Sequence, residues 1–177
     1  MQFPLPDLLC QSKRLNLRRF LPSDGPAIFA YSQEECTKRE LPDEVFDSLD
    51  ETLEIMDGLN ANADTGDYPI VYCISLREND HPIGHVSLSP LEGGVLEIGY
   101  AIGEAYQDYG YGSEATDLFT RWALAEGGIK RLYAIVKESN IPSIRCVEKA
   151  GYRLLRKEER DCFGGRYLIR EYVQEAE

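Results

Sequence analysis

The stretch that most constrains the fold of this chain runs from Val95 to Ser113 and reads VLEIGYAIGEAYQDYGYGS. Its first part, Val95–Ile102, is apolar and is broken only by Glu97 and Gly99. Such a run is typical of a strand that is covered on both faces inside a sheet. The carboxylate within it stands out, because burial disfavours the charged form of a Glu.

A glycine turn and then a helix follow this strand. Gly110 and Gly112 lack a Cβ, so another molecule can approach their backbone closely. The helix is indicated by apolar residues at helical spacing, namely Ala115, Leu118, Phe119, Trp122 and Ala123. The free amides of its first turn and the positive end of its dipole predict a phosphate or pyrophosphate site. The alternative is a tight turn without a ligand, and the spacing matches neither G-x-x-x-x-G-K-[ST] nor G-x-G-x-x-G.

Length and charge narrow the fold and the partners. A chain of 177 residues is enough for one domain with its own core, and we expect a single domain over residues 1–177. The formal net charge of −12 argues against nucleic acid or an anionic membrane as the main partner, since both need a basic surface. The same charge is compatible with a cationic substrate, or with acidic side chains that are simply solvated.

Cysteine and histidine usage predicts reduced thiols and no metal site. The 5 cysteines form no C-x-x-C pair and only 2 histidines are present, so a zinc site is not expected. An odd, scattered set of cysteines favours the cytoplasm. The opening MQFPLPDLLCQSKR has no signal-peptide pattern, and no apolar run is long enough to span a bilayer.

Hydrophobic periodicity predicts alternating strands and helices. Strands are expected at residues 14–18, 68–76, 83–88, 95–102, 132–136, 152–157 and 167–172. Four helices are expected: one after residue 22, one from residue 43 or 48 to residue 60, one between the glycine turn and Gly127, and one over 141–150. The rest of 34–50 is expected to be a loop. The resulting order, β-α-α-β-β-β-α-β-α-β-β, predicts an α/β fold with a mixed sheet and helices on both faces.

Four separated segments resemble one family. They are RLNLR at 14–18 with Asp24, EIGY at 97–100, QDYGYG at 107–112, and NIPS at 140–143 with EKAGY at 148–152. In this order they are similar to motifs of the GNAT superfamily of acyl-CoA-dependent N-acyltransferases. The resemblance is to its RimJ/RimL-type branch of ribosomal-protein N-terminal acetyltransferase-like enzymes, and it covers nearly the whole chain.

The resemblance implies a GNAT-type sheet, mostly antiparallel, with acetyl-CoA bound where the central strand separates from the next one. The pantetheine arm would pair with the backbone of residues 100–102 and with the Asn140 side chain, and the pyrophosphate with amides of the glycine turn. The residues so implied for acetyl-CoA are Tyr100, Ala101, Ile102, Gln107, Asp108, Tyr109, Gly110, Tyr111, Gly112, Ser113, Asn140 and Ser143. The structural alternatives are a helix cap for Asn140 and a first-turn position for Ser143.

Amine acetylation needs a deprotonated amine, a polarised thioester carbonyl and a proton for the departing thiolate. Glu97 is the candidate base, because burial in an apolar strand raises a carboxyl pKa toward neutrality. The alternative is a Glu that faces solvent or pairs with an Arg on a neighbouring strand. Ser143, which the resemblance places near the thioester sulfur, is the candidate proton donor, directly or through water. Backbone N–H groups near residues 101 and 102 are candidates for polarising the carbonyl.

Several positions depart from the superfamily. Val147 and Ile135 stand where another branch carries its catalytic Tyr and Glu, so neither role carries over. The glycine turn contains Asp108 and is followed by Glu114, whereas relatives often have Arg or Lys inside the turn. Carboxylates weaken pyrophosphate binding unless they point away or are offset by cations, for which the candidates are Lys137, Arg145, Lys149 and Arg153.

The sequence therefore predicts an acetyl-CoA-dependent N-acetyltransferase that acts on a small amine or a protein N-terminus by direct attack in a ternary complex. The alternatives are a non-catalytic acyl-CoA-binding domain and a nucleotide-phosphate binder, which the missing P-loop lysine disfavours. The acceptor is expected to be cationic, because residues 34–35 and 43–54 place carboxylates in the region that should flank it. The oligomeric state is left open, a homodimer included.

Overall fold

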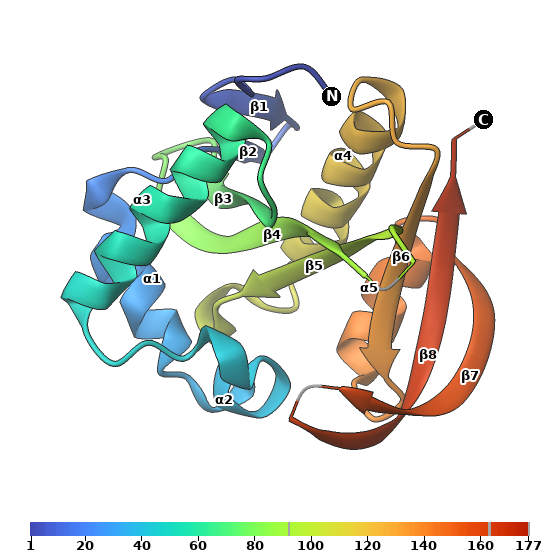
Figure 1. Cartoon of the computed structure of the whole chain (residues 1–177). Helices are drawn as coiled ribbons and strands as arrows, with labels where there is room; N and C mark the ends of the chain where they lie inside the picture. The colour runs from blue at the N-terminus through green and yellow to red at the C-terminus, as the bar shows by residue number, and fades with distance from the viewer. Residues whose placement is uncertain (92, 163, 177) are drawn as a thin grey trace.

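The computed structural model describes residues 1–91, 93–162 and 164–176, and its frame is one eight-stranded sheet (Figure 1). The strands lie in the order β1-β2-β3-β4-β5-β6-β8-β7. Their bounds are β1 Leu8–Gln11, β2 Leu15–Arg18, β3 Ile70–Leu76, β4 Pro82–Pro90, β5 Leu96–Ile102, β6 Arg131–Lys137, β7 Arg153–Cys162 and β8 Gly165–Glu175. Neighbouring strands are antiparallel except β5 and β6, which are parallel. The predicted mixed, mostly antiparallel α/β fold is confirmed.

Helices cover both faces of this sheet (Figure 1). The α-helices are α1 Gly25–Ser32, α2 Glu35–Glu40, α3 Leu49–Thr65, α4 Tyr111–Ala125 and α5 Ile141–Lys149, and the short 3-10 helices are η1 Pro22–Asp24, η2 Pro42–Glu44 and η3 Glu104–Tyr106. In the described ranges no helix is both long enough and apolar enough to cross a bilayer.

The alternation of side chains along the central strands divides the core into two layers. On β3, Tyr72 and its even-numbered neighbours pack in the same cluster as Phe119 and Trp122 of α4. The odd-numbered Val71 and Cys73 belong to a second cluster with residues of α1 and α3. Each face of the sheet therefore buries its own apolar layer, one under α4 and α5 and the other under α1 and α3.

The one parallel pair, β5 and β6, holds the feature that matters most for function. Its paired positions are Leu96 with Leu132 and Glu97 with Tyr133. Beyond Glu97 the described register contains no further β5–β6 pair, while β5 stays paired with β4 as far as Ile102. The two strands therefore diverge, and the edge of β5 that faces β6 is open.

The structure differs from the sequence prediction mainly in the first half of the chain. The N-terminal strand β1 was not predicted, and α2 and η2 occupy part of the segment expected to be a loop. Helix α3 begins after Ser48, one of the two starts that the sequence predicted. Ser48 is its N-cap, because its side chain accepts a hydrogen bond from the Glu51 amide. The helix continues past residue 60 to Gly66, whose positive φ of 87° ends it, so 62–66 is not the predicted loop.

A buried ion pair fastens the first helix to the sheet. Arg18 of β2 donates two hydrogen bonds to Asp24 of η1, at 2.6 and 3.0 Å. The same guanidinium donates to the side chain and carbonyl of Asp80 in the β3–β4 turn, at 2.8 and 3.1 Å. Asp24 is only 2% exposed, so its charge depends on Arg18 for compensation.

We expect Asp24→Ala to lower the free energy of unfolding by about 3 to 5 kcal/mol, because it leaves the buried Arg18 without its main partner. Urea denaturation followed by circular dichroism measures this. Glu35→Ala is the control: in the described part of the chain Glu35 has an exposed ion pair with Lys38 on α2, so this substitution should cost less than about 1 kcal/mol. Equal effects of the two substitutions would contradict a structural role for the buried pair.

Candidate functional site

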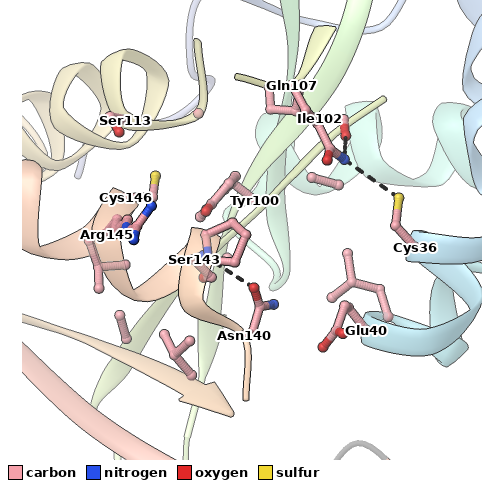
Figure 2. A pocket seen from close by; sticks show the side chains of 18 of the residues that line it. Cys36, Glu40, Tyr100, Ile102, Gln107, Ser113, Asn140, Ser143, Arg145 and Cys146 are labelled. Atoms are coloured by element: carbon pink, nitrogen blue, oxygen red, sulfur yellow. Dashed lines mark hydrogen bonds between the residues drawn. The ribbon is translucent and has the colours of Figure 1, made fainter. Parts of the chain in front are cut away.

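The divergence of β5 and β6 opens a cleft of about 530 Å³, and Figure 2 shows side chains that line it. Its walls come from the two strands, the end of η3 with the glycine turn, the first turn of α4, helix α5 and helix α2. Residues 97–102 of β5 and 134–137 of β6 line its floor. Because α2 lies on one side of the sheet and α4 and α5 on the other, the cleft can be reached from both faces.

The open edge of β5 presents backbone groups to this cleft. Tyr100, Ala101 and Ile102 pair on one side with Val86, His85 and Gly84 of β4, and all three line the cleft on the other. An extended ligand can add to such an edge through main-chain hydrogen bonds. This is the position at which the sequence predicted the pantetheine arm.

The glycine turn forms one end of the cleft. Gly110 is the N-cap of α4 and has a positive φ of 81°, while Asp108 has a φ of 65°. These conformations bring the first amides of α4 to the cleft, which is lined by Tyr111, Gly112 and Ser113. The N-terminus of a helix of this length carries free N–H groups and a positive dipole end, which suit an anion.

Gly112 is needed for a close contact rather than for an unusual backbone. A Cβ at this position would lie 3.0 Å from Cε2 of Tyr100 and 3.5 Å from Sγ of Cys146. Helix α4 can therefore pack directly against β5 and α5 at this point. A side chain at 112 would push the turn away from the strand and change the width of the cleft.

Two cations lie close to the glycine turn, and one of them pairs with Glu114. A Cβ built at Gly110 would lie 3.7 Å from a guanidinium nitrogen of Arg14 and 4.0 Å from Nζ of Lys149. Glu114 is turned toward Arg14, at 2.5 Å, and accepts a hydrogen bond from Ser12 at 2.6 Å. Its charge is thus neutralised by partners outside the cleft.

The other proposed cations divide into two groups. Arg145 lines the cleft beside Cys146, so it can face an anion there (Figure 2). Arg153 instead pairs with Glu175 on β8 at 3.2 Å. Lys137 lies at the opposite end of the cleft, where its ammonium contacts the Arg39 carbonyl at 3.0 Å. Lys149 and Arg145 are therefore the two of the four that the structure brings near the turn.

Gln107 and Tyr109 differ from the other predicted turn residues. The Gln107 amide donates to the carbonyl of Ile102 at 2.9 Å and contacts Sγ of Cys36 at 3.5 Å, so it ties the turn to the end of β5 (Figure 2). Tyr109 is 64% exposed and is not among the residues that line the cleft. Its ring stacks on that of Tyr111, and its carbonyl accepts a hydrogen bond from Arg14.

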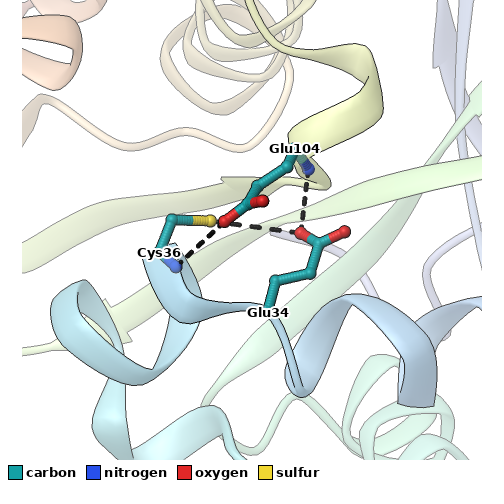
Figure 3. A group of neighbouring side chains, drawn as sticks. All are labelled: Glu34, Cys36 and Glu104. Carbon is teal, nitrogen blue, oxygen red and sulfur yellow. Dashed lines mark hydrogen bonds between the residues drawn. The ribbon is translucent and has the colours of Figure 1, made fainter.

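Helix α2 closes the other side of the cleft and is anchored to the segment after β5. Glu104 accepts a hydrogen bond from the Cys36 amide at 3.1 Å, and its own amide donates to Glu34 at 2.8 Å (Figure 3). The side-chain ligand atoms of these three residues lie within 4.8 Å of one another. Each carboxylate accepts a hydrogen bond from a backbone amide of the opposite segment. The cluster therefore connects the start of α2 to the start of η3.

Asn140 and Ser143 stand at the start of α5, on the wall of the cleft (Figure 2). Asn140 caps this helix, because its Oδ1 accepts a hydrogen bond from the Ser143 amide at 3.1 Å. The side-chain Nδ2 is not needed for the cap. The helix cap that the sequence offered as the alternative role of Asn140 is therefore present and uses Oδ1. This cap leaves Nδ2 available to a ligand.

The side chain of Tyr100 lies beside Ser143, a contact that the sequence did not predict (Figure 2). Burial raises the pKa of its hydroxyl well above the ordinary value, and Cys146 raises it further, while hydrogen bonding to Ser143 lowers it. The phenol therefore stays protonated at neutral pH and can exchange hydrogen bonds with the serine.

Glu97 occupies the point at which β5 and β6 part. Its Oε1 accepts a hydrogen bond from the Ile135 amide at 3.3 Å, which takes the place of the next strand–strand hydrogen bond. Burial raises the pKa of Glu97 to about 7, and nearby Glu171 raises it too, whereas the Ile135 amide and Arg160 lower it. A carboxyl group with a pKa near 7 is suited to accept a proton at neutral pH.

The sequence reasoning missed two contributors to the site: Arg14, which lies behind the glycine turn and outside the cleft, and α2, which forms one wall of the cleft. Arg14 was noted only as part of the opening strand, 95 residues from the carbonyl of Tyr109 that it binds. No local pattern links the two segments, because their proximity follows from α4 packing across β1 and β2. The acidic composition of 34–50 concealed the short helix, although this segment was expected to flank the acceptor.

Comparison with known proteins agrees with this geometry. Residues 14–153 match the acetyltransferase (GNAT) domain family. The chain is 30% identical over 143 residues to YnaD of Bacillus subtilis (strain 168), an uncharacterized N-acetyltransferase, and the match covers 80% of this chain and 81% of YnaD. The chain belongs to the GNAT acetyltransferase family and is an acetyl-CoA-dependent N-acetyltransferase.

Solved structures of the family share the fold. A GNAT-family acetyltransferase from Bacillus anthracis aligns with a TM-score of 0.78 at 23% identity, covering 94% of this chain and 97% of that one. RimL, a ribosomal L7/L12 alpha-N-protein acetyltransferase solved in complex with coenzyme A, aligns with a TM-score of 0.79 at 20% identity, covering 95% and 97%. These likenesses confirm the GNAT fold of the chain.

We expect Gly112→Val to weaken acetyl-CoA binding at least about tenfold, or roughly 1.4 kcal/mol. The cause is the collision with Tyr100, which displaces the first turn of α4. Isothermal titration calorimetry with acetyl-CoA measures it. Gly58→Val is the control, because a Cβ at Gly58 in α3 meets no atom within 4 Å. Unaltered affinity in a folded Gly112→Val variant would remove the turn from the binding site.

Proposed function

We propose that this enzyme transfers the acetyl group of acetyl-CoA directly to a primary amine while both substrates are bound, with Glu97 as general base. The observation that carries the proposal is the cleft between β5 and β6, which opens toward α4 and α5 on one side and toward α2 on the other. Acetyl-CoA would enter from the side of the α4 turn and the amine from the side of α2. The two would meet at the open edge of β5.

Glu97 is placed to serve the amine. Side chains alternate along β5, so Glu97 shares a face with Ala101, which packs in the cluster of α1 and α3. Its carboxylate therefore lies on the side from which the acceptor would come. It also lies against Ile135, the position at which another branch of the superfamily carries its catalytic Glu. The carboxylate of Glu97 would take a proton from the ammonium form of the acceptor, and the free amine would attack the thioester carbonyl.

Ser143 is the proposed proton donor for the thiolate that leaves. Its neighbour Tyr100 stays protonated and faces the same end of the cleft, so the two hydroxyls can pass a proton toward the sulfur. A serine alone is a weak acid, and a hydrogen-bonded phenol makes the relay more effective. Asn140 would hold the pantetheine through Nδ2, and the amides of residues 108–113 the pyrophosphate.

The acceptor is proposed to be a small amine or a protein N-terminus, preferably cationic. Two structural neighbours are named as ribosomal-protein acetyltransferases, which supports a protein acceptor. The carboxylates of 43–54 do not line the cleft in the described part of the chain, and Glu44 binds His85 at 3.2 Å. They would therefore act on an acceptor through their long-range field rather than by contact.

We expect Glu97→Gln to lower kcat by about 10² to 10⁴, the usual scale for a positioned acid–base group. The amide oxygen of Gln can still accept the Ile135 hydrogen bond, so the fold and acetyl-CoA affinity should change little. In the wild-type enzyme kcat/KM should rise with pH through about 7, because the carboxyl group is protonated below its pKa and cannot act as a base. Steady-state kinetics from pH 5.5 to 9 (about the range in which the group titrates) measure both effects.

Glu97→Ala is the companion variant, since it removes the hydrogen bond to Ile135 as well as the base. A lower melting temperature in Glu97→Ala but not in Glu97→Gln would separate the structural role from the chemical one. Near wild-type turnover of Glu97→Gln at every pH would mean that water takes the proton.

With a cationic acceptor and saturating acetyl-CoA, kcat/KM should fall as ionic strength rises, mostly through KM. The reason is that salt screens the attraction between the acceptor and a protein of formal net charge −12. Initial rates from low to high salt measure it, with a neutral amine as control. A flat profile for the cationic acceptor would exclude electrostatic steering and leave the acetyltransferase activity untouched.

A further inference from the structure

A row of charged side chains crosses the sheet beside the cleft and ends at Glu97. The Glu97 carboxylate reaches the amide of Ile135 on β6. Ile135 is in register with Glu171 on β8, and Glu171 with Arg156 on β7. Residues directly opposite one another share a face of the sheet, so this row lies on one face, the side on which the acceptor would bind.

Glu171 is the buried centre of the row. It is only 5% exposed, although it carries a formal charge. Two arginines of β7 compensate it: Arg156 donates to its Oε2 at 3.0 Å, and Arg160 makes a shorter contact to the same oxygen. The Glu158 carboxylate forms ion pairs with both guanidinium groups: its oxygens lie 3.5 Å from a nitrogen of Arg156 and 2.5 Å from a nitrogen of Arg160. Two positive and two negative side chains thus form a closed network.

The two arginines differ in their exposure to solvent and in their link to Glu97. The Arg156 side chain is 55% exposed, whereas that of Arg160 is 26% exposed. Arg160 is linked to Glu97 by geometry: its guanidinium contacts Oε2 of Glu171, and Glu171 stands opposite Ile135, whose amide donates to Glu97. Its positive charge lowers the pKa of Glu97. Since Glu171 stands opposite Ile135, one strand position from Glu97, and carries the same charge, an ionised Glu97 needs a cation within reach.

We propose that Arg160, fixed by Glu171 and Glu158, is a positioning residue that stabilises the ionised, proton-accepting form of Glu97. It touches neither substrate; it acts through the charge that it presents to the carboxylate. The inference rests on the proposed role of Glu97 as general base. The other charged and titratable groups toward this end of the cleft include Cys162 on β7, Glu171 on β8, Tyr133 and Lys137 on β6, and Arg39 and Glu40 of α2; Glu40 lies 3.5 Å from Lys137.

The test is the titration of Glu97 in variants of the network, read in two ways. Carbon-13 NMR of labelled glutamate carboxyl groups, assigned with Glu97→Gln, measures the titration directly. The acid limb of kcat/KM against pH measures its effect on catalysis. Arg160→Gln should move both midpoints up by about 0.5 to 1 pH unit, the scale expected when a partly screened positive neighbour is lost. Glu171→Gln should move them down, because it removes a like charge.

Two further variants control for structure. Arg160→Lys keeps the positive charge and should restore most of the wild-type midpoint. Arg156→Gln removes an arginine from the same Glu171 oxygen and should leave the midpoint unchanged. In the Arg160→Gln and Arg156→Gln variants the remaining arginine still pairs with Glu171, so the buried charge of Glu171 stays compensated.

An NMR midpoint that does not move in Arg160→Gln would overturn the inference, as would an equal upward shift in Arg156→Gln. A shifted NMR midpoint with an unshifted rate profile would uphold the coupling between Arg160 and Glu97 while contradicting the proposed base. The failure of one proposal is therefore distinguishable from the failure of the other.

Discussion

The separation of β5 from β6 after Glu97 is the constraint on which the rest of the structure depends. Parallel strands normally continue to exchange hydrogen bonds, and an open strand edge inside a protein leaves polar groups that need partners. Here the Glu97 side chain takes the Ile135 amide, and the remaining edge of β5 faces a cleft. The gap in the ladder is thus both a cost in backbone pairing and the place where an extended ligand can bind.

The charges at the two ends of this cleft differ from the negative net charge of the whole chain. At the glycine turn, Arg14 and Lys149 lie close to Gly110, and Glu114 is drawn away into a pair with Arg14. An anion site can therefore exist on a protein of net charge −12. At the other end, the single carboxylate of Glu40 pairs with both Arg39 and Lys137, so this group of three side chains offers no surplus of negative charge. Any attraction for a cationic acceptor must come from the outer carboxylates.

The same carboxyl group of Glu97 combines a structural and a proposed chemical role. As a hydrogen-bond acceptor it stabilises the end of the β5–β6 ladder, and this bond favours its ionised form. Burial opposes that effect more strongly, which leaves the pKa at about 7. Under the proposed mechanism, Gln at this position would keep the hydrogen bond to Ile135 and lose the proton-accepting group.

The sequence by itself determined the central strands and the long helices, though not β1, α2 or η2, and its resemblance to the GNAT superfamily indicated where the cleft lies. Apolar periodicity gave the long helices and central strands, and the run at Val95–Ile102 with its glycine turn marked the site, because these signals depend on neighbours within a few residues. Tertiary structure alone decided which distant groups meet there: Arg14 with the turn, Tyr100 with Ser143, and Arg160 and Glu171 near Glu97. Those contacts depend on strand order and register, which no local pattern encodes, since a strand of given composition can pair with several partners.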